Sequence, residues 1–368
     1  MTIDYQTRLQ TLLKSLNENN IDVGMITSPA NVFYFTGFNS DPHERFMALI
    51  FDNLNKEFTL FVPALDKEIA DTDSFVKNII PISDEENPFA KLKRALGPNV
   101  KRIGLEMNVV SMFRHNQLQS YFPDASYDDI QPGINRQRLK KSRNEIVYLQ
   151  QAVDIIEKVL AEGIKKVHAG MTEAELAAEL EYLMKKFGAV GPSFSTMVLA
   201  GEKAALPHGT PGERAFKKGD FLLIDFGVIT KEGYCSDITR TFIIGEASDK
   251  QKEIYNIVLQ SNQAGITAVK AGVPLKTFDI EARNIINQNG YGEYFNNRVG
   301  HGLGIEVHEE PSIHENNDQL AEKGLLFTIE PGIYIPNYGG VRIEDEVYIN
   351  EDGEAEVLTS FPRELQVL

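Results

Sequence analysis

Two stretches of the chain, about a hundred residues apart, repeat each other. Residues 218–227 and 323–332 align without a gap at an offset of 105 residues. Each stretch begins with Lys-Gly, continues through an apolar run and ends on an acid, one further residue and a glycine. Such a repeat strongly constrains the fold, because it predicts two related halves that face each other with pseudo-twofold symmetry.

Acids and histidines occupy matched positions in the two copies. The matched pairs are Asp225 with Glu330, Asp237 with Glu344, and His208 with His308. An acid at the end of an apolar strand is costly unless it is paired or bound to a metal. If the halves face each other, four carboxylates and paired imidazoles meet in one place, which is the composition of a metal site.

The helical segments are repeated as well. Residues 167–172 match residues 269–274 at an offset of 102, and Gly188 matches Gly290 at the same offset. In the first copy the second helix is expected to start on a capping box formed by Thr172 and Glu175, and in the second copy near Pro274. The pattern predicts a helix–helix–strands unit used twice, with helices covering one side of a curved antiparallel sheet, an α+β fold.

Residues 1–135 show a different pattern, in which helices and strands alternate. Leu9, Leu12, Leu13 and Leu16 have helical spacing, and strands are expected at residues 23–26, 46–51, 58–62 and 102–105. A turn-rich stretch near residues 133–140 indicates a boundary. We therefore expect an N-terminal α/β domain over residues 1–135 and a second domain over residues 136–368.

The composition narrows the class of protein. The net charge of −16 argues against nucleic-acid and anionic-membrane partners, which need basic patches. No apolar run is long enough for a membrane span, and the N-terminus does not resemble a secretory signal. The single cysteine, Cys235, excludes an intrachain disulfide framework. The cytoplasm is the expected location.

The glycine-rich segment 300–304 supplies His301, seven residues before His308. Four carboxylates and one imidazole suit two hard or borderline divalent ions. A pair of ions about 3.5–4 Å apart activates a bridging water and polarises a carbonyl group. His208 and His308 are expected to flank the ions as hydrogen-bond donors or proton shuttles.

Other catalytic motifs are not supported. Residues 225–227 spell the Asp-Phe-Gly of protein kinases, but no glycine-rich loop or His-Arg-Asp segment accompanies them. The glycines at 300–304 do not form a dinucleotide-binding pattern, and the chain has neither the zinc-peptidase nor the serine-hydrolase signature.

The second domain resembles the pita-bread metallopeptidases, which include methionine aminopeptidase, aminopeptidase P and prolidase. The motifs that carry the resemblance lie, in the family's order, at residues 225, 236–241, 300–309, 328–332 and 341–345. The resemblance implies five metal ligands: Asp225, Asp237, His301, Glu330 and Glu344. It also implies that Asp237 and Glu344 bridge the ions, that Glu330 is the general base, and that His208 and His308 stabilise the tetrahedral intermediate and relay protons. Arg342 and Tyr334 match positions that support the site.

The N-terminal region separates the subfamilies. Residues 29–38 resemble the N-terminal domain of creatinase, aminopeptidase P and prolidase, and creatinase lacks this full ligand set. The resemblance thus implies a homodimeric Xaa-Pro dipeptidase that hydrolyses the bond before proline through a metal-bridging hydroxide. Manganese is the expected metal, with cobalt or zinc as alternatives. By analogy, residues 41–45 reach the site of a partner subunit, with an ordinary surface loop as the alternative.

Two positions depart from the family pattern and leave alternatives open. Many relatives have a histidine four residues before the ligand histidine, where this chain has Asn297, and some prolidases have an arginine where this chain has Ser312. Both positions bear on how the proline side of the substrate is held. The alternatives are an Xaa-Pro aminopeptidase acting on longer peptides and a non-catalytic pita-bread binding module.

Overall fold

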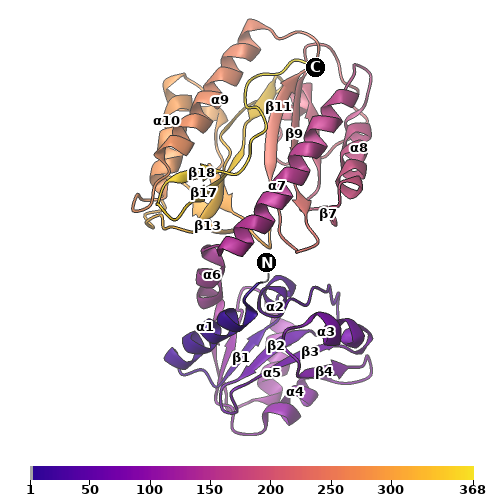
Figure 1. The fold of residues 1–368 in the computed structure, drawn as a ribbon, viewed down its shortest axis with the longest axis vertical. Helices are drawn as coiled ribbons and strands as arrows, with labels where there is room; N and C mark the ends of the chain where they lie inside the picture. Colours follow the sequence, from indigo (N-terminus) through magenta and orange to yellow (C-terminus); the bar gives the residue numbers. More distant parts are fainter. Residues whose placement is uncertain (1–2) are drawn as a thin grey trace. The chain divides into compact units, whose positions relative to one another are not determined.

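The structure is a computed structural model that describes residues 3–368. The chain divides into two compact units, one that ends at Arg138 and one that runs from Leu139 to Leu368 (Figure 1). Each unit has sheets, helices and a hydrophobic core of its own, so each is described by itself. Between residues 3 and 368, no helix is both long and apolar enough to cross a membrane.

The N-terminal unit is built on a mixed six-stranded sheet in the order β4-β3-β2-β1-β5-β6. The central strand β1 runs antiparallel to β2 and parallel to β5. The strands are β1 (Val23–Ile26), β2 (Ala48–Asp52), β3 (Glu57–Pro63), β4 (Ile79–Ile82), β5 (Arg102–Leu105) and β6 (Ser126–Asp129). The four strands predicted in this region are confirmed, β1 and β5 at the predicted bounds and the other two within two residues at each end.

Helices flank this sheet, and local sequence signals explain where they begin and end. They are α1 (Tyr5–Glu18), α2 (Pro29–Thr36), α3 (Lys67–Asp73), α4 (Pro88–Leu96), α5 (Met112–Tyr121) and α6 (Gln131–Leu139). Helix α1 buries Leu9, Leu12 and Leu16, as their spacing predicts. Helix α2 begins at Pro29 and ends before Gly37, whose φ of 76° is accessible to glycine at little cost.

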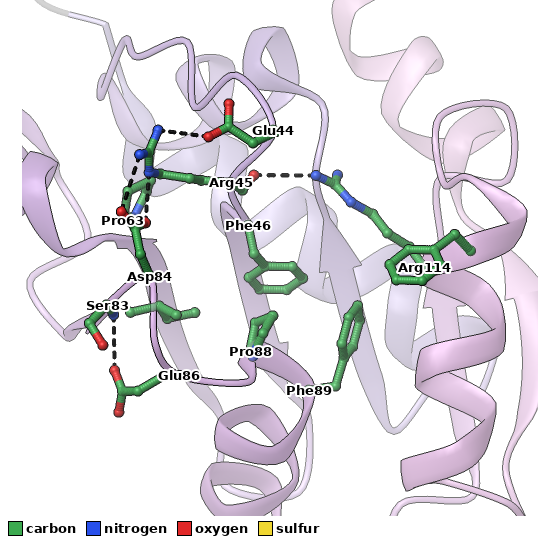
Figure 2. A pocket seen from close by; sticks show the side chains of 12 residues that line it. Glu44, Arg45, Phe46, Pro63, Ser83, Asp84, Glu86, Pro88, Phe89 and Arg114 are labelled. Carbon is green, nitrogen blue, oxygen red and sulfur yellow. Dashed lines mark hydrogen bonds and ion pairs between the residues drawn. The ribbon is translucent and has the colours of Figure 1, made fainter.

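A pocket of about 380 Å³ opens on the N-terminal unit, beside the segment 41–45 (Figure 2). Arg45 lies at its rim and forms a forked pair with Asp84 and a second ion pair with Glu44. Arg114 donates a hydrogen bond of 3.2 Å to the backbone carbonyl of Arg45. Contacts within the unit therefore hold Arg45, and the approach of residues 41–45 to a partner subunit stays a prediction.

The C-terminal unit has antiparallel sheets and two pairs of helices. The helices are α7 (Arg143–Gly163), α8 (Glu173–Lys186), α9 (Asp249–Ala268) and α10 (Lys276–Gln288). The strands are β7 (Gly191–Pro192), β8 (Met197–Ala200), β9 (Phe221–Phe226), β10 (Val228–Ile229), β11 (Ile238–Ile243), β12 (Gly300–Gly302), β13 (Glu309–Ile313), β14 (Leu326–Ile329), β15 (Gly332–Ile335), β16 (Gly339–Arg342), β17 (Asp345–Ile349) and β18 (Ala355–Val357). The two main sheets have the orders β11-β9-β8 and β13-β12-β14-β17-β18.

The internal repeat is visible in the helix pairs. Helices α7 and α9 both begin at a serine capping box, formed by Ser142 and Ser248. The turns that follow contain Gly170 and Gly272, whose φ angles are 93° and 86°. Helix α8 begins at the predicted Thr172 capping box, whereas α10 starts two residues after Pro274 and has no side-chain cap. The predicted duplication therefore extends to the backbone conformation of the turns.

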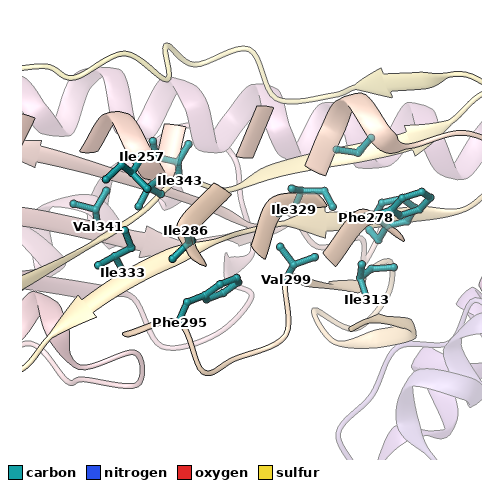
Figure 3. Packing of buried hydrophobic residues seen from close by; sticks show 14 of the residues in the cluster. Ile257, Phe278, Ile286, Phe295, Val299, Ile313, Ile329, Ile333, Val341 and Ile343 are labelled. Carbon is teal, nitrogen blue, oxygen red and sulfur yellow. The ribbon is translucent and has the colours of Figure 1, made fainter. Parts of the chain in front are cut away.

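Each helix pair covers a core of its own. Side chains of α7 and α8 pack with Leu222 and Ile224 of β9, whereas side chains of α9 and α10 pack with β14, β16 and neighbouring strands (Figure 3). Phe221 and Leu223 belong to the second core, because alternate residues of a strand face opposite sides. Asp225 follows Phe221 and Leu223 in this alternation. Its carboxylate is therefore directed away from α7 and α8 and toward the half that contains α9 and α10.

Strand β12 fits between β13 and β14 only because it begins with glycine. A Cβ atom on Gly300 would lie 1.8 Å from the carbonyl oxygen of Thr328. The glycine therefore allows the backbone to approach closely enough to bring His301 beside β14.

We expect Gly300→Ala to lower the free energy of unfolding by about 2 kcal/mol or more, because the added methyl group has no space. Urea unfolding followed by circular dichroism measures the change. Gly191→Ala is the matched control, since its Cβ would meet only the end of the Lys185 side chain, at 3.7 Å. Equal effects of the two substitutions would contradict the packing argument.

Candidate metal centre

Two antiparallel strand pairs bring the four repeated acids to the same end of the C-terminal unit. Strand β9 pairs with β11 so that Asp225 lies opposite Thr239, and Asp237 immediately precedes β11. In the second half, β14 pairs with β17 so that Ile329 lies opposite Asp345. Glu330 follows Ile329 and Glu344 precedes Asp345, so the two acids lie just beyond the end of this strand pair. Both strand pairs therefore direct their acids to one place.

A pocket of about 540 Å³ occupies this place. All nine residues singled out from the sequence line it: His208, Asp225, Asp237, His301, His308, Glu330, Tyr334, Arg342 and Glu344. Asn297 lines the pocket too, whereas Ser312 lies next to Arg298, a further lining residue. The sequence reasoning did not name Arg298.

Three of these residues form the tightest group. One ligand-type atom from each of Asp237, His301 and Glu344 lies within 4.8 Å of the others. His301 Nε2 is 3.7 Å from Asp237 Oδ2 and 3.2 Å from Glu330 Oε1. All three side chains are buried, so this group of oxygen and nitrogen donors is almost inaccessible to bulk water.

Arg342 connects residues of the two halves at this pocket. Its guanidinium forms an ion pair with Asp225 and donates hydrogen bonds to Tyr334 Oη at 2.9 Å and Thr239 Oγ1 at 3.0 Å. The Thr239 hydroxyl in turn donates to Glu344 Oε2 at 2.6 Å. The sequence placed Thr239 in the motif at residues 236–241 but indicated no role for it, although in an extended chain it points to the same side as Asp237, two residues earlier.

A second arginine holds the backbone next to the acids. Arg240 is 1% exposed, forms an ion pair of 2.9 Å with Asp345 and donates a hydrogen bond to the carbonyl of Glu344. Asp345 also accepts from Asn262 and Thr359. These contacts fix the backbone that carries Glu344. The sequence placed Arg240 in a motif but indicated no role for it.

Burial and mutual repulsion perturb the acids unequally. Burial, together with the neighbouring carboxylates, raises the pKa of Asp237 and of Glu344 well above the ordinary range. Burial also acts to raise the pKa of Glu330, but the hydrogen bond from His301 and nearby positive charge hold that pKa below its usual value. Burial next to His301 lowers the pKa of His308 to about 4. His308 is therefore neutral at pH 7.

The donor set fits divalent cations. Asp225 Oδ1 and Asp237 Oδ1 are buried and have no hydrogen-bond partner among residues 3–368. Leaving a buried carboxylate oxygen unpaired is costly, and a cation among the carboxylates would offset both this cost and the repulsion. Carboxylate oxygens with one imidazole nitrogen are typical ligands of Mn²⁺, Co²⁺ and Zn²⁺.

The histidines surround this donor set. The rings of His301 and His308 meet edge to face, with centroids 4.2 Å apart. His208, which follows the short helical segment Gly201–Ala205, lines the same pocket. The pocket thus combines acids with three imidazoles, which is the chemistry of a metal-assisted hydrolase.

The sequence matches two families over nearly its whole length. Residues 8–140 match the Creatinase/Prolidase N-terminal domain, and residues 147–351 match Metallopeptidase family M24. An uncharacterized peptidase of Staphylococcus aureus (strain bovine RF122 / ET3-1) is 41% identical over 357 residues, which cover 97% of this chain and 100% of the relative.

Solved structures give the same result. A prolidase from Pyrococcus horikoshii OT3 superposes with a TM-score of 0.90 and 34% identity, covering 97% of this chain and 99% of that one. An Xaa-Pro dipeptidase from Bacillus anthracis has a TM-score of 0.90 and 33% identity, covering 99% and 100%. An X-Pro aminopeptidase from Thermotoga maritima MSB8 has a TM-score of 0.86 and 35% identity, covering 96% and 100%.

These matches confirm the predicted α+β fold, with a creatinase-type N-terminal domain and a pita-bread domain. They also set aside a non-catalytic binding module, since the relatives are peptidases. The chain belongs to metallopeptidase family M24 and is a hydrolase.

Proposed function

We propose that this hydrolase is an Xaa-Pro dipeptidase that works with two divalent metal ions. The observation that carries the proposal is the buried group of Asp237, His301 and Glu344 in a pocket that two further acids line. Likeness to a prolidase and to an Xaa-Pro dipeptidase supports a dipeptide with proline in second place as the substrate.

In this proposal the chain holds the two ions with Asp225, Asp237, His301, Glu330 and Glu344. We favour manganese, with cobalt or zinc as alternatives. When bound, such ions supply Lewis acidity, which lowers the pKa of water and polarises a carbonyl group. Burial raises the pKa of Asp225, and the ion pair with Arg342 opposes this effect and orients the carboxylate, while Tyr334 orients Arg342.

The remaining groups of the pocket handle protons and the substrate. The pKa of Glu330 is lowered, so its carboxylate is ionised at neutral pH and can accept a proton as the general base. The pKa of His308 is about 4, so its neutral imidazole keeps one N–H, which can donate a hydrogen bond to the oxygen of the scissile carbonyl. His208 is the proposed second donor or proton relay.

An Xaa-Pro aminopeptidase that acts on longer peptides is the second candidate. Its support is the likeness to the X-Pro aminopeptidase from Thermotoga maritima, at 35% identity, together with Ser312. We further propose that the enzyme is a homodimer and acts in the cytoplasm. Size-exclusion chromatography with light scattering tests the dimer.

Asp237→Asn should lower kcat by more than about 100-fold, because even outer-shell changes at metal sites cost 10–100-fold. The measurement is hydrolysis of Xaa-Pro and Xaa-Pro-Yaa peptides with manganese, cobalt or zinc, together with metal analysis of the protein. Asp249→Asn is the control, since it removes the same charge from an exposed position on α9. If the protein cannot be loaded with two ions and Asp237→Asn leaves activity unchanged, the proposal is wrong. Turnover of tripeptides alone would favour the aminopeptidase.

Once a chelator has removed the metal, the free energy of unfolding should depend on pH in a defined direction. The raised pKa values of Asp237 and Glu344 mean that the folded state binds more protons than the unfolded state above the ordinary carboxyl range. The free energy of unfolding should therefore fall as the pH rises from 5 to 8, by up to about 1.4 kcal/mol per pH unit for each proton.

Urea unfolding at several pH values, with EDTA or with Mn²⁺, measures this slope. Saturating Mn²⁺ should raise stability most at high pH, because the metal competes with protons for the same oxygens. Asp237→Asn should lessen the slope in EDTA. A metal-free protein that becomes more stable between pH 5 and 8, with no change in the variant, would contradict the assignment.

A further inference from the structure

We propose that two buried lysine–glutamate ion pairs position the two histidines that flank the donor set. The pairs are Lys141 with Glu309, for His308, and Lys203 with Glu173, for His208. The two glutamates would be positioning residues, because each acts through a histidine of the pocket. This inference rests on the proposed peptidase function, in which these histidines donate hydrogen bonds or relay protons.

Both histidines lie on loops and need support from outside the regular structure. His208 follows the helical segment Gly201–Ala205, His308 precedes β13, and both residues are exposed. Exposed loops are the more mobile parts of a fold. A donor to a reacting oxygen, however, has to be held within about 0.5 Å of its productive position. Contacts of the loops themselves must therefore supply this precision.

Glu309, the residue that follows His308, ties its loop to a fixed lysine. The Glu309 carboxylate forms an ion pair of 3.0 Å with Lys141, and the two side chains are only 6% and 1% exposed. Its other oxygen accepts from the backbone N–H of Glu306 at 3.0 Å. Lys141 is itself anchored, because its N–H donates to the carbonyl of Gly324 at 2.8 Å. One carboxylate thus holds the loop on both sides of His308.

The loop before His308 packs directly on this ion pair. A Cβ atom on Gly304 would lie 2.9 Å from either carboxylate oxygen of Glu309 and 3.0 Å from Cε of Lys141. The carbonyl of Gly304 accepts from the N–H of Cys235 at 2.8 Å, and the Cys235 thiol donates to the next carbonyl along the loop at 3.2 Å. The glycine therefore leaves the space that the ion pair occupies.

Glu173 holds the other histidine loop in the same way. It is the first residue of α8, is fully buried, and accepts from the N–H groups of Ala200 at 2.9 Å and Gly212 at 3.0 Å. It also pairs with Lys203, whose ammonium donates to the carbonyl of Thr210 at 3.0 Å. The pair therefore contacts the chain both before and after the histidine.

Stability alone does not account for the two pairs. Removing a lysine and a glutamate from water costs about as much as their attraction returns, and apolar residues of similar volume often serve as well. The duplication does not account for them either, because Glu173 aligns with Leu275 at the offset of 102, and Glu309 aligns with Gly209. Both histidine loops thus have the same kind of ion pair although the repeat does not supply it, which favours a role in positioning.

Crossed double variants test the inference. Glu309→Gln should lower kcat for an Xaa-Pro peptide by about 10–100-fold with KM within about twofold, because a misplacement of about 1 Å has an effect of this size. In a His308→Ala background the same change should have no further effect, because Glu309 acts through that histidine. In a His208→Ala background it should lower kcat by its full factor.

Glu173→Gln should give the opposite pattern, with no further effect in the His208→Ala background and its full effect in the His308→Ala background. Each pair is therefore the control for the other. Glu162→Gln removes a glutamate from an exposed lysine pair on α7 and should change kcat in no background.

A variant without either charge keeps the test valid if a single substitution impairs folding. Glu309→Gln leaves the ammonium of Lys141 buried without this partner, which is destabilising. The double variant Lys141→Met/Glu309→Gln removes both charges, so it should keep the wild-type unfolding midpoint while kcat stays as low as in Glu309→Gln. Recovery of the wild-type kcat in the double variant would show that the pair does not position His308.

A second readout does not depend on catalysis. The ring centroids of His301 and His308 are 4.2 Å apart, so their ring protons should give a nuclear Overhauser cross-peak in zinc-loaded protein with labelled histidines. Glu309→Gln should remove this cross-peak, and Glu173→Gln should leave it unchanged. A cross-peak that persists unchanged in Glu309→Gln would overturn the role of that residue.

The outcomes separate the inference from the function on which it rests. If the metal-loaded wild type cleaves neither Xaa-Pro nor Xaa-Pro-Yaa peptides, the proposed function fails, and the cross-peak alone decides whether Glu309 positions His308. If the wild type is active but each glutamate lowers kcat equally in both histidine backgrounds, the peptidase stands and the positioning role is wrong. An effect that vanishes only when the matching histidine is absent supports the inference.

Discussion

The gathering of four carboxylates in one pocket, three of them buried and Glu330 partly buried, is the constraint on which the rest of the C-terminal unit depends. Asp237 and Glu344 form no ion pair with a lysine or arginine of residues 3–368. Of the four acids, Asp225 alone is paired directly with an arginine of the described residues, Arg342. The chain therefore concentrates more negative charge than it neutralises, and its packing must hold these groups together against their repulsion. Two buried arginines and the paired sheets supply that restraint.

The duplication supplies the acids in pairs, but the strand pair β9–β11 is not identical to the strand pair β14–β17. Ile224 and Ile329 are equivalent in the repeat, yet Ile224 pairs with Arg240, whereas Ile329 pairs with Asp345, which is equivalent to Ile238. The strand registers thus differ by two residues. A shift of two keeps every side chain on its original face, so the acids of both halves still face the pocket. The positions they offer to cations cannot be equivalent.

Much of the fold could be predicted from the sequence, because the signals were local or repeated. The strands β1 and β5, the Thr172 capping box and the paired helices follow from apolar runs, caps and the offsets of about 100 residues. The roles of Thr239 and Arg240 could not be predicted in this way. Each depends on a contact with a distant residue, the hydrogen bond from Thr239 to Glu344 or the ion pair of Arg240 with Asp345, and no spacing along the chain specifies such a contact.

Arg240, Arg298 and Arg342 lie near the pocket and differ in their exposure. They therefore differ in how many acceptors within the chain each of them needs. Arg240 and Arg342 are almost inaccessible, and each is surrounded by acceptors of the chain itself, because a buried guanidinium without partners would be strongly destabilising. Arg298 is exposed, so water can solvate it and no acid of the chain is needed. An exposed cation contributes little to folding, but the buried pair of Arg283 and Asp279 nevertheless fixes its backbone. Burial, rather than proximity to the acids, therefore decides which of these arginines must find acceptors within the chain.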